Sequence, residues 1–185
     1  FLLVAGRKKH LFRYFIITHL VIIVLVWLTG LISPRFNMFR ILDKKQHHFV
    51  SMVEDTEDVG SAISLHDIDP EIVSVLKHTP TALYNSLVRP HVFEWHSALM
   101  AVAGLEKLVL MLLLIYAAIY HKGLKHDEKN LLYFSMSFVL ILFTTTGLST
   151  PVLGALTRYN IPAMPFYAAC IIMLGNWKKL RIKRN

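Results

Sequence analysis

The feature that most limits how this chain can fold is a long apolar run from Ser97 to Tyr120. It carries a carboxylate and an ammonium side by side, Glu106 and Lys107. The run is long enough to cross the hydrocarbon of a bilayer, which takes about 20 residues. An ionisable group at that depth costs roughly 2.5–3.5 kcal/mol on insertion scales, so such groups usually face protein or water and often mark a site. The sequence therefore predicts a charged membrane span, preceded by the polar loop 89–96.

The composition of the whole chain agrees with a membrane protein. It is 55% hydrophobic, its mean hydropathy is +0.49, and its apolar residues form continuous blocks. We therefore expect an all-α fold: a polytopic transmembrane helical bundle of four complete spans with a helical extracytoplasmic loop domain. The net charge of +8 does not indicate a nucleic-acid partner, because the basic residues lie at the ends of spans, where lipid phosphate and topology explain them.

The order of apolar and polar segments gives the expected domain boundaries. The chain opens without an initiator Met, and FLLVAG followed by RKKH indicates that 1–10 is the end of a truncated upstream span and a cytoplasmic basic turn. We therefore expect a C-terminal fragment. The four spans are expected at 11–33, 98–120, 131–148 and 161–177, the outer segments at 34–97 and 149–160, and the cytoplasmic loop and tail at 121–130 and 178–185.

The distribution of basic residues predicts the orientation of these spans. Clusters at 7–13, 122–129 and 178–184 hold twelve of the twenty Lys and Arg residues, whereas the short loop between the last two spans holds only Arg158. Because short cytoplasmic loops collect Lys and Arg, the three clusters are expected in the cytoplasm, and the 34–97 segment and Arg158 outside.

Two short helices are expected in the 34–97 segment. Asp69-Pro70-Glu71 supplies an N-cap, a proline at the first helical position and an acid in the first turn. Thr79-Pro80 repeats the signal, and Pro90 ends the second piece. Each piece is too short to be stable alone in water, so we expect a compact loop domain rather than a disordered tether.

Charged residues near the outer surface are the candidate site. Arg89 and Arg158 each lie beside aromatic residues, and arginine suits a bidentate grip on phosphate, although ordinary headgroup anchoring explains them as well. Lys107 is a third candidate for a phosphate or lipid contact. The candidates for deprotonating an acceptor hydroxyl are Glu94, His91 and Glu106.

The sequence leaves two interpretations of the charged span open. In one, Glu106 faces a polar cavity as a general base or cation contact, and Lys107 snorkels or finds a phosphate. In the other, the span starts nearer Glu106, and 91–104 is a re-entrant or interfacial segment. His19, in the first span, is expected to be packed or hydrogen-bonded rather than a proton carrier.

No sequence motif indicates a cofactor, and none is predicted. Nucleotide-binding loops, HExxH helices and paired CxxC motifs are missing from the sequence. A metal site would have to use one of three sets of residues: His47 and His48, His66, or His91 and His96 with Glu94. The spacings in these sets do not place the ligands on one helical face. We predict solvated loop histidines and no metal site.

Three motifs carry a resemblance to a protein group. They are RPHVFE at 89–94, GLEK at 104–107 and GLSTPVLGALTRYNIPAMPF at 147–166. Over about residues 79–170 the chain resembles the C-terminal portion of multi-span proteins of bacterial envelope-glycan assembly. Its long outer loop is similar to the layout of O-antigen polymerases and ligases. The loop motifs of those enzymes have no clear match here, so their catalytic residues are not carried over.

The resemblance implies a protein of the bacterial cytoplasmic membrane that handles lipid-linked saccharide at its outer face. The expected partners are membrane lipids, a polyprenyl-pyrophosphate-linked glycan and other membrane proteins. If the chain acts on such a glycan, Arg89 and Arg158 would hold the pyrophosphate of the polyprenyl carrier. The enzyme class implied is a glycosyltransferase or polymerase acting on the glycan. The alternative is a non-enzymatic transporter or a structural subunit of a membrane complex, so the sequence leaves the question of catalysis open.

Overall fold

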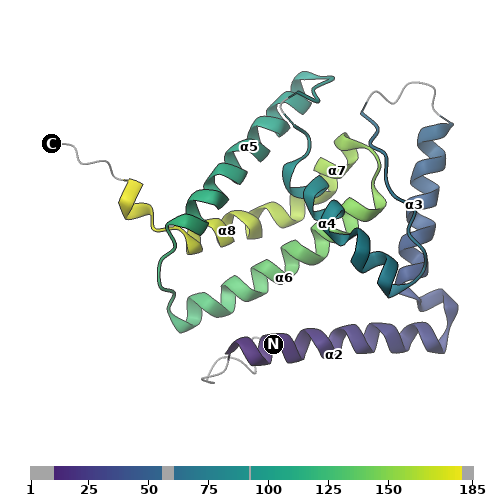
Figure 1. Cartoon of the computed structure of the whole chain (residues 1–185), viewed down its shortest axis with the longest axis horizontal. Helices are drawn as coiled ribbons and strands as arrows, with labels where there is room; N and C mark the ends of the chain where they lie inside the picture. Colours follow the sequence, from purple (N-terminus) through teal and green to yellow (C-terminus); the bar gives the residue numbers. More distant parts are fainter. Residues whose placement is uncertain (1–10, 56–60, 92, 181–185) are drawn as a thin grey trace.

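The computed structural model describes residues 11–55, 61–91 and 93–180, and in these ranges the chain is helical, with isolated bridges but no β-strand. The expectations for 1–10 and for the end of the basic tail lie outside the described residues. The elements, drawn in Figure 1, are α2 (Leu11–Ile32), η1 (Pro34–Phe36), α3 (Met38–Glu54), α4 (Ile72–Val88), α5 (Ala98–Ile119), α6 (His126–Ser149), α7 (Leu153–Asn160), η2 (Ile161–Ala163), α8 (Met164–Leu174) and η3 (Trp177–Leu180).

Three of these helices, α2, α5 and α6, are long and apolar enough to cross a membrane. The prediction of an all-helical fold with several helices able to cross a membrane is confirmed. The predicted count of four complete spans is not confirmed. The segment 161–177 folds as a 3₁₀ turn followed by α8, whose 11 residues extend only about 17 Å. Pro162 and Pro165 lie at the starts of η2 and α8, because proline is best tolerated in the first turn of a helix.

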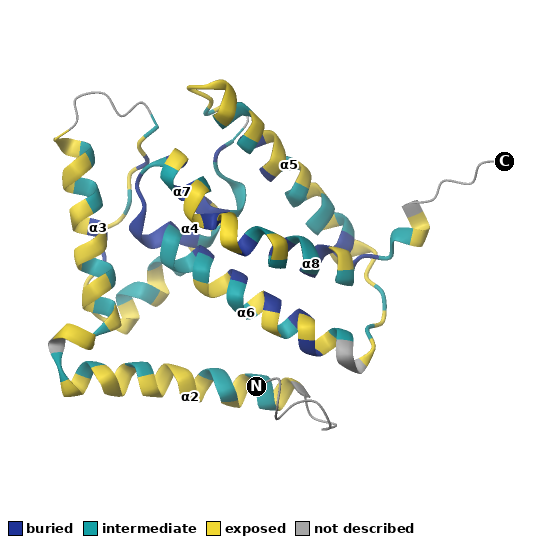
Figure 2. Cartoon of the chain, turned by 180° about the vertical axis from the view of Figure 1, so that it is seen from behind, coloured by how far each residue is buried: buried dark blue, intermediate teal, exposed yellow. Residues whose placement is uncertain are grey.

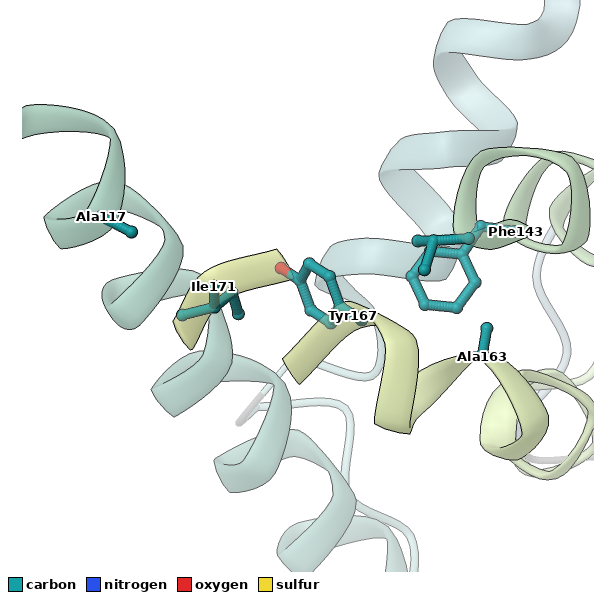
Figure 3. Packing of buried hydrophobic residues seen from close by; sticks show 6 residues of the cluster. Ala117, Phe143, Ala163, Tyr167 and Ile171 are labelled. Carbon is teal, nitrogen blue, oxygen red and sulfur yellow. The ribbon is translucent and has the colours of Figure 1, made fainter. Parts of the chain in front are cut away.

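The bundle is built from α5, α6 and α8, which enclose a shared apolar core. Phe143 of α6 meets Tyr167 of α8 edge to face, with ring centroids 5.8 Å apart. Figure 3 shows this packing from close by, with α5 on the other side of α8. The buried members of the core are Ala117, Val139, Phe143, Ala163, Tyr167 and Ile171.

The chain leaves α5 and α8 at the same end of the bundle. The amide of Asn176 donates to the carbonyl of Tyr120 at 2.7 Å, and the amide of Lys122 donates to the carbonyl of Leu174 at 3.0 Å. These two bonds tie the loop after α5 to the end of α8. The start of α6 lies at this end too, as Figure 1 shows.

Helix α2 lies apart from the core. None of its apolar 18-residue window is buried within the chain, and Figure 2 shows the helix largely in the colour of exposed residues. Its start contacts the bundle through Phe12 and Phe15, whose rings lie 6.0 and 5.0 Å from that of Tyr133. His19 in this helix is hydrogen-bonded to the carbonyl of Phe15 at 2.7 Å, which confirms the expectation of a bonded histidine.

The 34–97 segment is more helical than the sequence predicts. Helix α3 is not anticipated by any cap in the sequence analysis. The two short helices expected after Asp69 and Thr79 are wrong: the chain forms one helix, α4, whose N-cap is Glu71 and which runs through Pro80. An interior proline costs about 3 kcal/mol. We attribute the tolerance of Pro80 to the packing of the helix after it, since Ala82 and Ser86 are buried.

Helix α4 crosses α6 so closely that the contact requires a glycine. A Cβ at Gly147 would lie 2.7 Å from the carbonyl carbon of Ala82 and 2.8 Å from the hydroxyl of Ser86. The extended chain before α4 is fixed by Gln46 of α3, which donates to the carbonyl of His66 at 2.8 Å and accepts from the amide of Ile68 at 3.1 Å. The loop segment is therefore packed onto the bundle.

Candidate functional site

The loop 89–96 between α4 and α5 holds a cluster of charged side chains around Glu94. One carboxylate oxygen, Oε1, pairs with Nη2 of Arg89 at 3.3 Å. The other, Oε2, lies 3.0 Å from Nδ1 of His91 and also accepts the backbone N–H of His91 at 2.9 Å. The loop closes on itself through the amide of Glu94, which donates to the carbonyl of His91 at 3.0 Å. Three of the sequence candidates are thus brought into direct contact.

These contacts set the protonation of Glu94. Partial burial raises the pKa of its carboxyl, but the hydrogen bonds from His91 and the charge of Arg89, together with that of His91 when its ring is protonated, outweigh burial, so the net pKa is below the usual 4.5. Glu94 is therefore ionised at neutral pH. An ionised carboxylate can only accept hydrogen bonds, so the Nδ1 of His91 carries a proton.

The same histidine reaches a residue that the sequence analysis did not single out. Its Nε2 lies 2.9 Å from the hydroxyl of Tyr84 on α4. Because Nδ1 is the donor to Glu94, the neutral ring accepts at Nε2, and Tyr84 donates to it. No spacing rule pointed to Tyr84, since the turn of the chain after Val88 brings it back to His91.

The loop lies directly on α5, where Gly104 makes room for it. A Cβ at Gly104 would be 3.1 Å from the carbonyl oxygen of Pro90 and 3.3 Å from that of His91. Pro90 is fully buried in this contact. The GLEK motif therefore has a structural meaning here: its glycine seats the loop, and its lysine lies one turn further along the same helix.

The structure places the adjacent charges of α5 in different surroundings. Glu106 is exposed on the outer face of the helix beside Leu105 and Val109, so it does not face a cavity of this chain. Lys107 is only 2% exposed. Neighbouring residues on a helix point about 100° apart, so only one of the two can face the bundle. Helix α5 begins at Ala98 and includes both charges in one continuous helix.

Lys107 is buried among neutral groups. Its Nζ donates to the carbonyl of Ser86 at 2.7 Å and lies 4.0 Å from the sulfur of Met164 and 5.1 Å from the ring centroid of Phe143. Among the described residues no carboxylate pairs with it. A buried ammonium without a counterion is costly, which makes this side chain a functional candidate.

A layer of neutral polar groups surrounds the lysine. The hydroxyl of Thr146 donates to Oδ1 of Asn160 at 2.6 Å, and Nδ2 of Asn160 lies 3.4 Å from the carbonyl of Ser86. The hydroxyl of Ser86 donates to the carbonyl of Phe143 at 2.7 Å. This layer joins α4, α6 and α7 at the level of Lys107. Asn160 was outside the predicted site, although its neighbour Arg158 was included.

A pocket of about 120 Å³ opens between the loop and α5. His91 and Lys107 are the polar side chains that line it. The rest of its wall is apolar, with contributions from Val88, Pro90, Phe93, Leu108 and Met111. We call this the α5 pocket. It combines a cation, a histidine and an apolar surface, which suits an amphiphilic anion.

Arg89 lies at the same loop with spare hydrogen-bonding capacity. Its Nε is buried and has no acceptor among the described residues. Arg158, by contrast, is exposed on α7, two residues away from both Leu156 and Asn160, which are buried. Positions two apart on a helix differ by about 200°, so Arg158 points away from the buried face. Arg158 is not among the residues that line the α5 pocket, and the shared arginine site stays a prediction.

The histidines that a metal site would have used do not form one cluster. Among the residues that the structure describes, no group of three or more metal-ligating side chains is found. His47 pairs with Asp43 at 3.1 Å, and the ring of His66 stacks on that of His78 with centroids 5.2 Å apart. Comparison with protein-family models, curated proteins and solved structures finds no match to this chain, so its site is interpreted from geometry alone.

Proposed function

We propose that this chain is part of an integral membrane protein that handles a lipid-linked saccharide at the outer face of the bacterial cytoplasmic membrane, and that the α5 pocket binds the diphosphate of a polyprenyl carrier. The observation that carries the proposal is Lys107. Its ammonium is buried without a carboxylate partner among the described residues, and the residue lines a pocket whose wall is otherwise mostly apolar. A bound phosphate would supply the missing negative charge.

The surroundings of the pocket agree with this ligand chemistry. Arg89 is not part of the pocket wall, but it lies between two residues of that wall, Val88 and Pro90, and its buried Nε–H is free to donate. Planar guanidinium donors suit phosphate oxygens. The apolar wall offers a surface to the first isoprene units, while the rest of a long chain would lie in the bilayer. His91 provides a group able to move a proton at the edge of the same pocket. A reaction at this site would transfer the glycan from its diphosphate to an acceptor hydroxyl.

Binding of farnesyl diphosphate to the full chain in lipid nanodiscs tests the proposal. We expect saturable binding that weakens by about tenfold or more in Lys107→Met and Arg89→Lys, since a hydrogen bond to a charged group contributes roughly 1.5–3 kcal/mol. Arg158→Lys is the matched control and should bind as the unmodified protein does, because Arg158 lies on α7, whereas Arg89 lies between Val88 and Pro90, which line the pocket. Inorganic pyrophosphate and discs containing phosphatidylglycerol separate recognition of a free anion or a common headgroup from recognition of the prenyl diphosphate. Equal binding by Lys107→Met would overturn the proposal.

A second candidate function is a structural subunit of a membrane protein complex. It is favoured by α2, because no residue of its apolar window is buried within the part of the chain that the structure describes. A photo-crosslinking residue at Leu25, which is 55% exposed, would test it in intact membranes. Crosslinks to one defined membrane protein would support the subunit role, whereas crosslinks to lipid only would contradict it.

A further inference from the structure

We infer that Tyr84, His91 and Glu94 form a proton-transfer chain in which the phenol of Tyr84 is the end that meets a substrate hydroxyl. The contacts are continuous: Tyr84 hydroxyl to His91 Nε2 at 2.9 Å, and His91 Nδ1 to Glu94 Oε2 at 3.0 Å. Neither the sequence motifs nor the proposed binding site assigns a role to Tyr84. The inference rests on the proposed function only for the identity of the hydroxyl that is deprotonated.

The direction of proton movement follows from the hydrogen-bond partners. Ionised Glu94 fixes the proton of the neutral imidazole on Nδ1 and leaves the Nε2 lone pair facing the phenol. If Nε2 takes the phenolic proton, the resulting imidazolium remains paired with the carboxylate, which is the arrangement that makes a histidine an effective base. Arg89 holds the other carboxylate oxygen and so keeps Glu94 oriented. Glu94 is therefore the positioning residue of the proton-transfer chain, because it orients His91 and does not contact the substrate.

The geometry also gives the proton-transfer residues access to a substrate. Tyr84 is 48% exposed, so its hydroxyl can be approached from outside the protein. His91 lines the α5 pocket, where the diphosphate would bind. The base thus lies between a route for an acceptor and the site of the leaving group. Such placement is a requirement for transfer between two bound partners.

The proposed step balances as follows. The acceptor oxygen attacks the anomeric carbon, forming a C–O bond while the bond from that carbon to the diphosphate oxygen breaks. The electron pair of the broken bond leaves with the polyprenyl diphosphate. The acceptor proton passes to the oxygen of Tyr84 as the phenolic proton moves to Nε2 of His91, and the imidazolium later releases its proton to water. No oxidant, reductant or further reactant is needed.

An activity-independent test uses the nucleophilicity of the phenol. An aryl sulfonyl fluoride reacts with a tyrosine by forming an O–S bond and releasing fluoride, and a base that removes the phenolic proton accelerates the reaction. Tyr120 and Tyr159 are controls of comparable exposure, at 42% and 41%. Each also has a lysine ammonium near its ring, at 5.2 and 5.8 Å, so they control for a nearby positive charge.

The full chain in nanodiscs is labelled without any lipid-linked ligand, and each site is quantified by mass spectrometry. We expect Tyr84 to react roughly tenfold or more faster than both controls, and His91→Gln and Glu94→Gln each to bring its rate down to theirs. Tyr120 and Tyr159 should keep their rates in both variants, which shows that the fold is intact. Tyr84 labelling equal to the controls, or unchanged in His91→Gln with control rates preserved, would overturn the inference.

If a variant fails to fold, the control tyrosines change rate together, and the unmodified protein then decides the matter through the rate ratio alone. The outcome is separate from the proposed function, because farnesyl diphosphate binding is measured independently in the Lys107 and Arg89 variants. Binding without an activated Tyr84 refutes the proton-transfer chain only. An activated Tyr84 without binding refutes the diphosphate ligand only.

Discussion

The ammonium of Lys107 donates a 2.7 Å hydrogen bond to the backbone carbonyl of Ser86, and so joins α5 to the last turns of α4 inside the bundle. The carbonyl also lies 3.4 Å from Nδ2 of Asn160. The bond places the one buried cation of the described residues beneath the loop that carries Arg89, His91 and Glu94.

Replacement of Lys107 separates stability from binding. Lys107→Met keeps a long apolar side chain beside Met164 and Phe143 and removes the cost of burying a charge, so the free energy of unfolding should stay the same or rise by about 1–2 kcal/mol. Lys107→Ala removes packing and should lower it by about 2 kcal/mol or more. Thermal unfolding in detergent measures both. A strongly destabilised Met variant would mean that the ammonium holds the fold together.

The crossing of α4 and α6 should be intolerant of any side chain at Gly147. Gly147→Ala places a methyl group against the Ala82 carbonyl, and the overpacking should destabilise the protein by about 1–3 kcal/mol. The matched control is Gly154→Ala, where a Cβ meets nothing within 4 Å. The control should be neutral or slightly stabilising, because alanine favours a helix over glycine by up to about 1 kcal/mol. Equal melting temperatures for the two variants would contradict the close crossing.

The structure of the loop 89–96 should depend on pH through Glu94. Its folded pKa lies below the ordinary 4.5, so the stabilisation is fully present above that value and is lost as the pH falls through the folded pKa. The fluorescence of Trp95, next to Glu94, should therefore change in acid at a midpoint below 4.5. Glu94→Gln should lack that transition. A transition that persists in the Gln variant would assign it to another group.

The predicted orientation can be checked by labelling from outside the cell. In a Cys170→Ser background, a cysteine at Ser61 should react with an impermeant maleimide, and a cysteine at Lys125 should not, because the basic clusters are expected in the cytoplasm. Permeabilised cells, in which both positions should react, serve as the control. Labelling of position 125 in intact cells would reverse the topology.

The sequence by itself determined the all-helical class of the fold and selected three of the residues that cluster in the loop 89–96. Continuous apolar blocks of about 20 residues can form buried backbone hydrogen bonds only as helices, so α2, α5 and α6 were predictable from composition and length. Arg89, His91 and Glu94 could be selected because charged and aromatic residues gather where a span begins. The prolines of the 161–177 segment also indicate that it does not form one unbroken helix, although the sequence analysis expected a complete span there. In the structure the segment divides into η2, α8 and the start of η3.

The tertiary structure decided which charges act together. Adjacent residues such as Glu106 and Lys107 have the same hydropathy context, and only the packing of α5 on α4 selects Lys107 for the interior. Helix α4 continues past Pro80 because Ala82 and Ser86, which follow the proline, are buried in tertiary contacts. Tyr84 meets His91 because the chain turns back after α4, a relation set by backbone geometry rather than spacing. Such partners are fixed by three-dimensional contacts, whose energies depend on neighbours that are distant in the chain.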